Sequence, residues 1–243
     1  PHEYGVTYQY AVGLNSTKPF GSPTPQSTCC GGTGSENHVK YQEAAYFVND
    51  NTMWIALYMP TIAQWDAKGV TIEQSCTWPA EKSVIKITDG SASFSLKLRV
   101  PYWATEGFDV KLNGKSIAKE YQPCSYVEIP ERQWSKKDKI EVIMPFTKHI
   151  DFGPDKMTTA ISVKNGKQSM EPMWVGAFMY GPLVMATTGI EEWEDATLTL
   201  NSDLREIKLE GATSDSGTDG NIYSLNINGR KFVPDCYADE NAT

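Results

Sequence analysis

The sequence predicts a mainly β protein: an antiparallel β-sandwich with a smaller C-terminal β unit, preceded by a loop and one helix. Apolar and polar residues alternate from Phe94 to Val100, which is typical of a strand with one buried and one wet face. Asn113-Gly114 and Asn228-Gly229 each separate two apolar runs, and Asn-Gly supplies the positive φ angles of a two-residue hairpin turn. The predicted strands follow one another without intervening helices, which favours an antiparallel sandwich.

One helix is expected ahead of the strands. Ser35 is a suitable N-cap residue, and the helix is expected to run from there to about Phe47. It would bury Val39, Ala44, Ala45 and Phe47. A single helix of this length is marginal in water, so it needs packing partners.

Local composition assigns the remaining segments. Residues 1–34 are rich in turn-forming residues. We expect strands at 84–87 and 140–144, a long connection at 147–173, one or two buried strands within Trp174–Thr187 and a mobile loop from Gly211 to Asn221. Four tryptophans could form either a sugar-stacking surface or part of the core, and at least two are expected in the core: Trp54, Trp65, Trp78 and Trp103.

Two adjacent cysteines, Cys29 and Cys30, stand directly before a glycine-rich stretch and the predicted helix. A disulfide needs Cα atoms roughly 4.4–6.8 Å apart, whereas neighbouring Cα atoms lie about 3.8 Å apart. A bond between the two would strain the backbone, so we expect free thiols. Adjacent free thiols suit metal ligation or nucleophilic chemistry. The alternatives are two small apolar fillers of a tight turn, or a redox sensor, which needs exposure and a lowered thiol pKa.

Composition excludes several classes of partner. The chain has 243 residues and 40% hydrophobic content, which argues against general disorder. Its formal net charge of −8 disfavours nucleic acid and anionic membranes, since both reward clustered Lys and Arg. No run of about 20 apolar residues is present, so no membrane-spanning helix is expected. The cysteine count of 5 is odd, which argues against a complete disulfide framework.

Several motifs occur in a fixed order along residues 1–190. They are Cys29-Cys30-x-Gly32-Thr33-Gly34-x-Glu36-Asn37, Leu57-Tyr58-Met59-Pro60, Leu96-x-Leu98-Arg99-Val100-Pro101-x-Trp103, Leu112-Asn113-Gly114, Met144-Pro145 and Tyr180-Gly181-Pro182-Leu183-Val184. No single motif is specific. Their order and spacing together resemble glycoside hydrolase families 127 and 146, the β-L-arabinofuranosidases.

The resemblance implies three parts within a longer parent protein. Residues 1–50 would be the C-terminal remnant of an (α/α)6 catalytic barrel, with the cysteine loop and the closing helix. Residues 51–147 would be the β-sandwich, and residues 148–243 a connection and a second β unit. The chain is then expected to be a fragment, and the missing N-terminal barrel domain would be its partner.

The resemblance also implies a chemistry. In these families the first cysteine of the pair attacks the anomeric carbon of a glycan, and a glutamate is the general acid/base. Zinc is held by both cysteines, a third cysteine and that glutamate. Carried onto this sequence, Cys29 matches the nucleophile and a zinc ligand, and Cys30 matches the second zinc ligand. The other two ligands have no match, because residues 1–28 contain no cysteine and Cys76 lies in the predicted sandwich.

The expected function is therefore the C-terminal part of a retaining arabinofuranosidase that acts on plant-type, arabinose-containing oligosaccharides or glycans. As a separate chain it is expected to be inactive, because the acid/base is absent. The polysaccharide substrates of the resembled family imply a periplasmic or secreted location. The alternative is a non-catalytic β-sandwich module that binds carbohydrate or supports a partner domain, and exposed aromatic residues gathered in one patch would favour binding.

Overall fold

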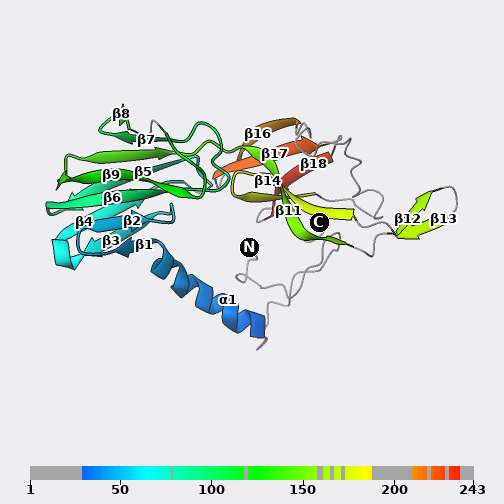
Figure 1. Cartoon of the computed structure of the whole chain (residues 1–243), viewed down its shortest axis with the longest axis horizontal. Helices are drawn as coiled ribbons and strands as arrows, with labels where there is room; N and C mark the ends of the chain where they lie inside the picture. The colour runs from blue at the N-terminus through cyan, green and yellow to red at the C-terminus, as the bar shows by residue number, and fades with distance from the viewer. Residues whose placement is uncertain are drawn as a thin grey trace. The chain divides into compact units, whose positions relative to one another are not determined.

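The computed structural model describes residues 29–77, 79–117, 120–157, 161–164, 167–170, 173–187, 210–217, 220–227 and 230–235. Over these residues the protein is mainly β, as predicted (Figure 1). The described residues up to Thr147 form one compact unit, and most of those from Lys148 onwards form a second. None of the described helices has the length and apolar character needed to cross a membrane.

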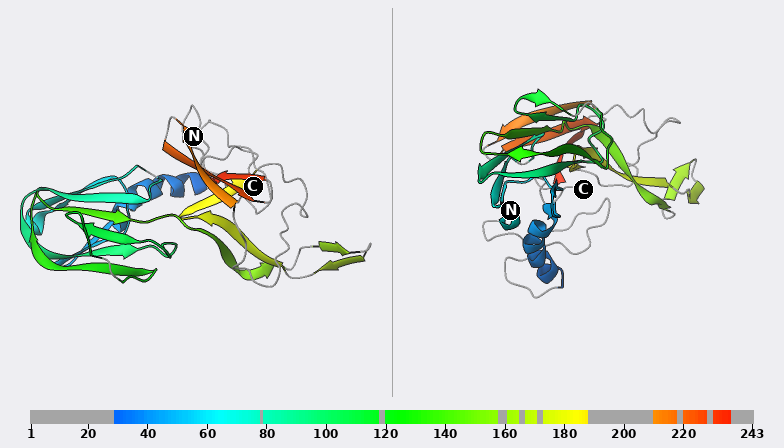
Figure 2. Two further views of the ribbon diagram at one scale, coloured as in Figure 1. Left: turned by 90° about the horizontal axis from the view of Figure 1, so that it is seen from above. Right: turned by 60° about the vertical axis from the view of Figure 1, so that its left-hand side comes forward.

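The first unit begins with a helix and continues as a two-sheet sandwich. Its elements are α1 (Cys29–Lys40), η1 (Tyr41–Ala44), β1 (Tyr46–Val48), β2 (Thr52–Ile55), β3 (Thr61–Trp65), η2 (Asp66–Lys68), β4 (Val70–Ser75), β5 (Lys82–Asp89), β6 (Ala92–Val100), β7 (Asp109–Leu112), β8 (Lys115–Ser116), β9 (Ser125–Trp134) and β10 (Lys139–Ile143). One sheet has the strand order β1-β2-β6-β9, and the other has the order β3-β4-β5-β10-β7-β8. Figure 2 shows both sheets from two further directions.

The sandwich is antiparallel as predicted, with one exception. Strand β2 pairs with β6 in parallel, with Thr52 opposite Ser95 and Ile55 opposite Leu98. Between these strands the chain crosses to the other sheet and builds β3, β4 and β5 there before it returns. A long crossover of this kind is what a parallel pair requires, because a short hairpin can only join antiparallel strands.

The core lies between the two sheets, and β6 and β9 supply large side chains to it. Phe94, Leu96, Leu98 and Val100 are each at most 2% exposed, which confirms the predicted alternation from Leu96 to Val100. Ser95, expected on the wet face, is also buried, at 8% exposure, where the register against β9 shifts. Trp134 is fully buried and stacks on Phe94 with ring centroids 5.7 Å apart. Its indole Nε1 donates to the Phe94 carbonyl oxygen at 2.8 Å, so this large aromatic group is buried without an unpaired donor.

A buried amide joins the two sheets. Gln74 on β4 is 2% exposed, and its Nε2 donates to the Tyr46 hydroxyl at 2.8 Å and to the Leu57 carbonyl oxygen at 3.0 Å. Ser83 donates to Gln74 Oε1 at 3.3 Å, and the Tyr46 hydroxyl also lies 2.7 Å from Thr61 Oγ1. Because Tyr46 and Gln74 belong to different sheets, this network fixes β1 against the opposite sheet.

In the second unit the described strands form one six-stranded sheet and a separate hairpin. The strands are β11 (Lys148–Met157), β12 (Ile161–Lys164), β13 (Lys167–Met170), β14 (Met173–Tyr180), β15 (Leu183–Thr187), β16 (Glu210–Gly217), β17 (Gly220–Ile227) and β18 (Arg230–Pro234). The sheet order is β11-β14-β15-β18-β17-β16, and β12 pairs with β13. The one or two strands predicted within Trp174–Thr187 correspond to β14 and β15, and four of the five residues of β15 are buried.

Two predictions for this unit were wrong. Residues 147–173 are not a long connection but carry β11, β12 and β13, and the described residues of the predicted mobile loop, 211–217 and 220–221, lie in β16 and β17. The register of β11 against β14 shifts between Phe152 and Lys156, around a Gly-Pro pair that resembles a turn in the sequence but is tolerated at a bulge of an edge strand. Strand β16 is also an edge strand, where a polar sequence is acceptable.

The predicted helix was wrong in its bounds and its buried face. The helix begins at Cys29, six residues before Ser35, and ends at Lys40, while Tyr46–Val48 is a strand. Phe47 is 52% exposed and Val39 is 67% exposed. Ala44 is exposed as well, and only Ala45 of the four expected residues is buried, at 1%. Pairing of β1 with β2 decides this segment, since tertiary contacts override a weak helical preference.

The predicted Asn113-Gly114 hairpin turn is confirmed. Asn113 has φ 51° and Gly114 has φ 83°, and Leu112 pairs with Lys115 across the turn. Two positive φ angles between paired strands define a type I′ turn. The second predicted turn, Asn228-Gly229, lies outside the described residues, although Ile227 and Arg230 on either side of it are register partners.

Two glycines with positive φ offer a matched test of the η2 region. At either position, the left-handed conformation would cost an alanine about 1–2 kcal/mol of folding free energy. A Cβ at Gly90 (φ 74°) would collide with the Gly69 carbonyl oxygen, whereas a Cβ at Gly69 (φ 60°) would meet no atom within 4 Å. We expect Gly90→Ala to lower the free energy of unfolding by at least about 1 kcal/mol more than Gly69→Ala, as measured by urea unfolding; equal losses would contradict the steric argument.

The buried amide network yields a second prediction. Gln74→Leu keeps the side-chain size but leaves the Tyr46 hydroxyl, the Leu57 carbonyl and the Ser83 hydroxyl with one partner fewer. We expect a loss of about 1–3 kcal/mol in the free energy of unfolding. The matched control is Glu73→Leu on the same strand, which should change stability by less than about 0.5 kcal/mol. Similar losses for both variants in urea titrations would refute the role assigned to Gln74.

Candidate functional site

Cys29 and Cys30 are the first two residues of α1, so the cysteine pair and the helix belong to one element. Their side chains lie outside the part of the chain that the structure describes, and their roles as nucleophile and zinc ligands stay predictions. Neighbouring Cα atoms lie about 3.8 Å apart, so a disulfide between the two residues remains disfavoured. In general, the N-terminus of a helix favours a thiolate over a thiol.

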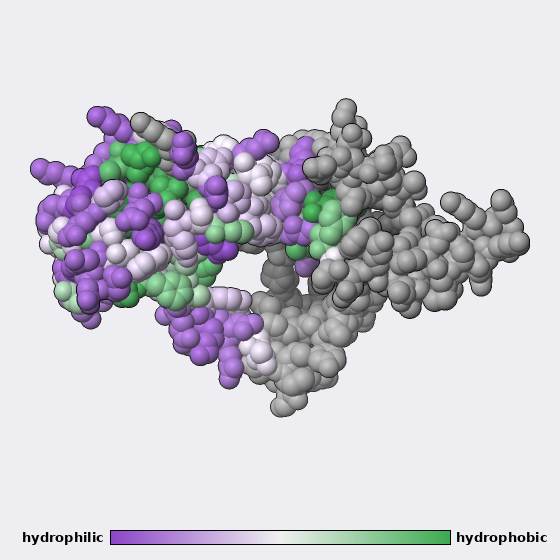
Figure 3. All heavy atoms as spheres, viewed as in Figure 1, coloured by the Kyte–Doolittle hydropathy of each residue, from purple (hydrophilic) through white to green (hydrophobic). Residues whose placement is uncertain are grey.

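The described part of α1 beyond the cysteines is mostly polar. Glu36, Asn37 and Lys40 are exposed, and Lys40 Nζ lies 3.4 Å from a carboxylate oxygen of Glu43, an exposed pair of little energetic weight. Figure 3 shows hydrophilic side chains along this segment. The described side chains of α1 therefore give it no apolar stripe of its own.

The chain becomes fixed to the sandwich at Ala45 and Tyr46. The Ala45 carbonyl oxygen accepts hydrogen bonds from the backbone N–H groups of Ala56 at 2.9 Å and Leu57 at 3.4 Å. Tyr46 enters the buried amide network of Gln74, and burial raises the pKa of the Tyr46 hydroxyl despite its hydrogen bonds. A neutral hydroxyl at this position keeps the network intact near neutral pH. The cysteine pair is thus joined, through α1 and η1, to a rigid point of the fold.

No group of three or more His, Cys, Asp or Glu side chains gathers within the described residues. Cys76 and Cys124 are free thiols; burial raises the pKa of the Cys76 thiol, and Cys124 is exposed with φ 62°. His149 Nε2 lies 3.5 Å from Asp151 Oδ1 in the second unit. The described residues therefore offer no metal-binding cluster of their own.

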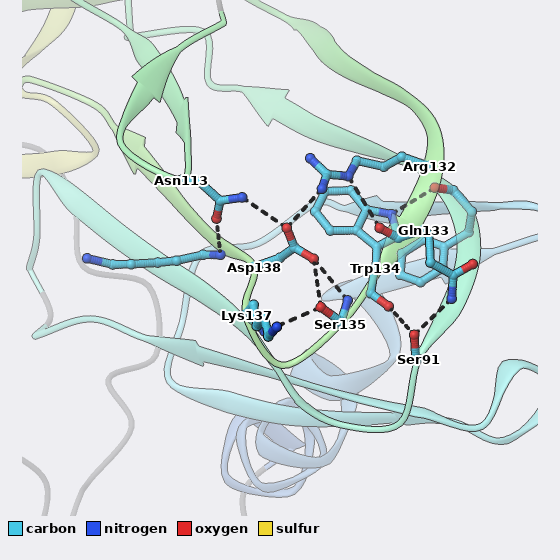
Figure 4. A network of polar contacts seen from close by, with 10 residues as sticks. Ser91, Asn113, Arg132, Gln133, Trp134, Ser135, Lys137 and Asp138 are labelled. Atoms are coloured by element: carbon cyan, nitrogen blue, oxygen red, sulfur yellow. Dashed lines mark hydrogen bonds and ion pairs between the residues drawn. The ribbon is translucent and has the colours of Figure 1, made fainter.

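A buried carboxylate forms a polar network between β7, β9 and β10 (Figure 4). Asp138 Oδ1 accepts from Asn113 Nδ2 at 3.0 Å and from Arg132 Nη2 at 2.9 Å, and Oδ2 accepts from the Ser135 backbone N–H at 2.9 Å. Burial opposes the charged form, but these hydrogen bonds and the charge of Arg132 outweigh it and hold the pKa of Asp138 below its usual range. This carboxylate fixes the turn at Asn113 and the turn between Ser135 and Asp138. A carboxyl group with a lowered pKa does not suit proton donation at neutral pH.

In the described part of the chain, the other carboxyl groups whose pKa departs from its ordinary value also have a lowered pKa. Hydrogen bonds from Lys82 and Lys139 hold the pKa of Glu141 down, and Lys136 with the Gly90 N–H does so for Asp89. A general acid at neutral pH needs a raised pKa. None of the described carboxyl groups whose pKa is shifted has the raised pKa that this role requires.

Aromatic and charged side chains share the outer face of the β1-β2-β6-β9 sheet. Phe47 on β1 is opposite Trp54 on β2, Trp54 is opposite Lys97 on β6, and Lys97 is opposite Glu128 on β9. Residues opposite one another in a sheet lie on the same face. The sequence pointed to Trp54 but not to this row, because the register between strands far apart in sequence could not be read from composition.

The remaining tryptophans divide as expected. Trp65 and Trp103 are core residues, 7% and 8% exposed, which confirms that at least two belong to the core. Trp78 lies outside the described residues. Trp54 is intermediate in exposure and is the one described member of the four that reaches the outer face.

Residues 52–146 match the family model of the Beta-L-arabinofuranosidase, GH127 middle domain. This range runs from β2 to just beyond β10, so the chain is GH127-like over its sandwich, as the sequence motifs predicted. A comparison with curated proteins gave no match.

Three solved structures share the fold, each with a TM-score of 0.58. A GH127 β-arabinofuranosidase is 18% identical, and the match covers 89% of this chain and 38% of that protein. A glycoside hydrolase is 17% identical, and the match covers 93% of this chain and 40% of that protein. A GH127 β-L-arabinofuranosidase from Geobacillus stearothermophilus T6 is 16% identical, and the match covers 89% of this chain and 36% of that protein. The chain thus spans less than half the length of each of these proteins.

The lowered pKa of Asp138 predicts an acid-dependent loss of stability. A depressed native pKa stabilises the fold above the unfolded-state pKa of about 3.9, and this contribution is lost as the pH falls further through the native value. We expect Asp138→Asn to be less stable than the native protein by about 1–2 kcal/mol at pH 7, and the difference to shrink below pH 4. Urea unfolding at several pH values tests this.

The control for this series is Asp50→Asn, which alters an exposed carboxylate. It should leave the pH dependence of stability unchanged. A difference between the native protein and Asp138→Asn that stays constant from pH 7 to pH 3 would contradict the assignment of Asp138.

Proposed function

We propose, on the premise that residues 52–146 are a GH127-type middle domain, that this chain is the C-terminal portion of a retaining glycoside hydrolase. Its substrates would be plant-type glycans that contain β-L-arabinofuranose. In this proposal Cys29 is the nucleophile, the sandwich supports the catalytic domain, and the enzyme works in the periplasm or outside the cell.

One observation carries the proposal most directly. The cysteine pair begins α1, and only η1 and β1 separate that helix from β2, where the match to the GH127 middle domain begins. The pair therefore stands immediately upstream of the domain that the family model describes. The anchoring of the following segment at Ala45 and Tyr46 supports a rigid connection between a cysteine site and the sandwich.

The chemistry would be a double displacement. The Cys29 thiolate attacks the anomeric carbon, a C–S bond forms as the glycosidic C–O bond breaks, and a general acid protonates the leaving oxygen. Water then attacks the same carbon, the C–S bond breaks, and the thiolate is restored. Two inversions leave the configuration retained. Residues 1–28 contain no cysteine and so no match to the acid/base element of the resembled families, and the proposal assigns the general acid to another part of the complete protein.

A zinc ion fits the donor chemistry of the cysteine pair but not the number of ligands. Thiolates are preferred zinc ligands, and a structural or catalytic zinc takes at least three protein ligands. Cys29 and Cys30 supply two, and the described residues hold no cluster of three candidate ligands. We therefore assign Cys29 and Cys30 as two members of a ligand set that other parts of the protein complete, and derive no catalytic step through zinc.

The test is hydrolysis of an aryl β-L-arabinofuranoside by the complete protein that carries this chain. We expect Cys29→Ser to lower kcat by at least about 1,000-fold, because a hydroxyl at the same position is a much weaker nucleophile. Cys124→Ser is the matched control, since Cys124 is an exposed free thiol of the sandwich, and it should leave kcat unchanged. Near-normal hydrolysis by Cys29→Ser would refute the assignment.

Zinc content adds an independent readout. The complete protein should bind one zinc ion, and Cys30→Ser should lose most of it, whereas the present chain should bind less than one equivalent and show no turnover. Turnover by the present chain alone would contradict the proposed division of the active site.

A further inference from the structure

We propose that the outer face of the β1-β2-β6-β9 sheet binds a neutral saccharide chain. The name aromatic face is used here for this surface, formed by Phe47, Trp54, Lys97, Arg99, Tyr126 and Glu128. This proposal does not depend on hydrolysis or on Cys29. It assigns a binding site to the sandwich itself.

Strand register brings these residues into two adjacent rows. The first row runs Phe47, Trp54, Lys97, Glu128 across the four strands. With neighbouring strands about 4.8 Å apart, this row spans about 14 Å. The second row lies two residues further along β6, where Arg99 is opposite Tyr126. The residues between them, such as Leu98, point into the core at 0% exposure, so both rows lie on the same outer surface.

The aromatic face is accessible to a ligand. Phe47 is 52% exposed and Tyr126 is 43% exposed, and the side chains of Lys97 and Glu128 are 31% and 50% exposed. Exposed aromatic side chains on a sheet surface leave large apolar areas in water, which a sugar ring can cover with its C–H groups.

Hydrogen-bonding groups stand beside the rings. Lys97 Nζ lies 5.6 Å from the centroid of the Trp54 ring and 3.4 Å from Glu128 Oε2. The Lys97 ammonium itself lies over the Trp54 ring, so a ligand at this position meets the cationic donor and the Glu128 acceptor side by side above the ring, which suits two neighbouring hydroxyl groups. Arg99, whose Nη1 also donates to the Ala56 carbonyl at 3.3 Å, supplies a further donor next to Tyr126.

The make-up of this surface favours a saccharide over the other classes of partner. Thr52 on β2 adds a hydroxyl of intermediate exposure, whose oxygen lies 2.8 Å from that of the buried Ser95, and no aliphatic side chain stands among the outward residues of β2 and β6. A protein that docked here would remove the Lys97–Glu128 pair from water, which is costly, whereas sugar hydroxyls can replace that water. The net charge of −8 disfavours polyanions.

The experiment is affinity electrophoresis of the full chain in gels that contain soluble branched L-arabinan, with a soluble β-glucan as a second probe. We expect retardation by at least one of these neutral polysaccharides. Trp54→Ala should weaken the binding at least tenfold, and Tyr126→Ala should weaken it measurably. Thermal unfolding of each variant checks that it is folded, and Glu128→Gln provides a milder change at an exposed position if Trp54→Ala does not fold.

The matched control is Phe152→Ala, which removes an aromatic side chain of similar exposure, 40%, from the second unit. It should bind like the native chain. Native binding by folded Trp54→Ala and Tyr126→Ala, or absence of binding by the native chain to both probes, would overturn the proposal. So would a dimer, seen by light scattering, that dissociates in Trp54→Ala, because the face would then belong to a second copy. Cys29→Ser should bind normally, so the outcome is separate from that of the proposed hydrolysis.

Discussion

The sandwich depends on the side-chain amide of Gln74. It is buried between the two sheets, and it satisfies groups from three segments at once: Tyr46 of β1, the Leu57 carbonyl after β2, and Ser83 of β5. A buried polar group that is fully paired specifies one arrangement, because any shift of either sheet would leave donors and acceptors unpaired. Strand β1 is only three residues long, and its few backbone pairs with β2 would fix it weakly without this amide.

Like Gln74, the carboxylates of the sandwich with lowered pKa values have hydrogen-bond partners that stabilise the fold. Asp138 and Glu141 are held in their charged forms by several donors each, which is the opposite of what an acid catalyst needs. The proposed function accordingly assigns the nucleophile to the cysteine segment and gives the sandwich a supporting role. The outer sheet surface is different, because its charged residues lie beside exposed rings and are accessible to a ligand.

Local signals in the sequence predicted the sandwich well. The alternation along Leu96–Val100 and the Asn113-Gly114 turn each depend on residues within a few positions of one another, and both are confirmed. The errors came where pairing with another strand decides the local structure. Tyr46–Val48 resembles a helix end until β2 is known to lie beside it, and Gly153-Pro154 resembles a turn until the bulge against β14 is seen. The cysteine pair was found from the sequence, but its role depends on side chains that a local pattern cannot position.

The parallel pairing of β2 with β6 has a consequence for how the fold assembles. Thr52 and Ser95 are 43 residues apart in the chain, and the loop between them must close before β2 gains its partner. Contacts of such high sequence separation form late, after hairpins such as β3–β4 and β4–β5. Strand β1 pairs only with β2 in its sheet, and the short turn between Val48 and Thr52 makes this pair a local hairpin that can form before β2 meets β6. The helix that begins with Cys29 and Cys30 is therefore joined to a hairpin that enters the sheet only when β2 pairs with β6.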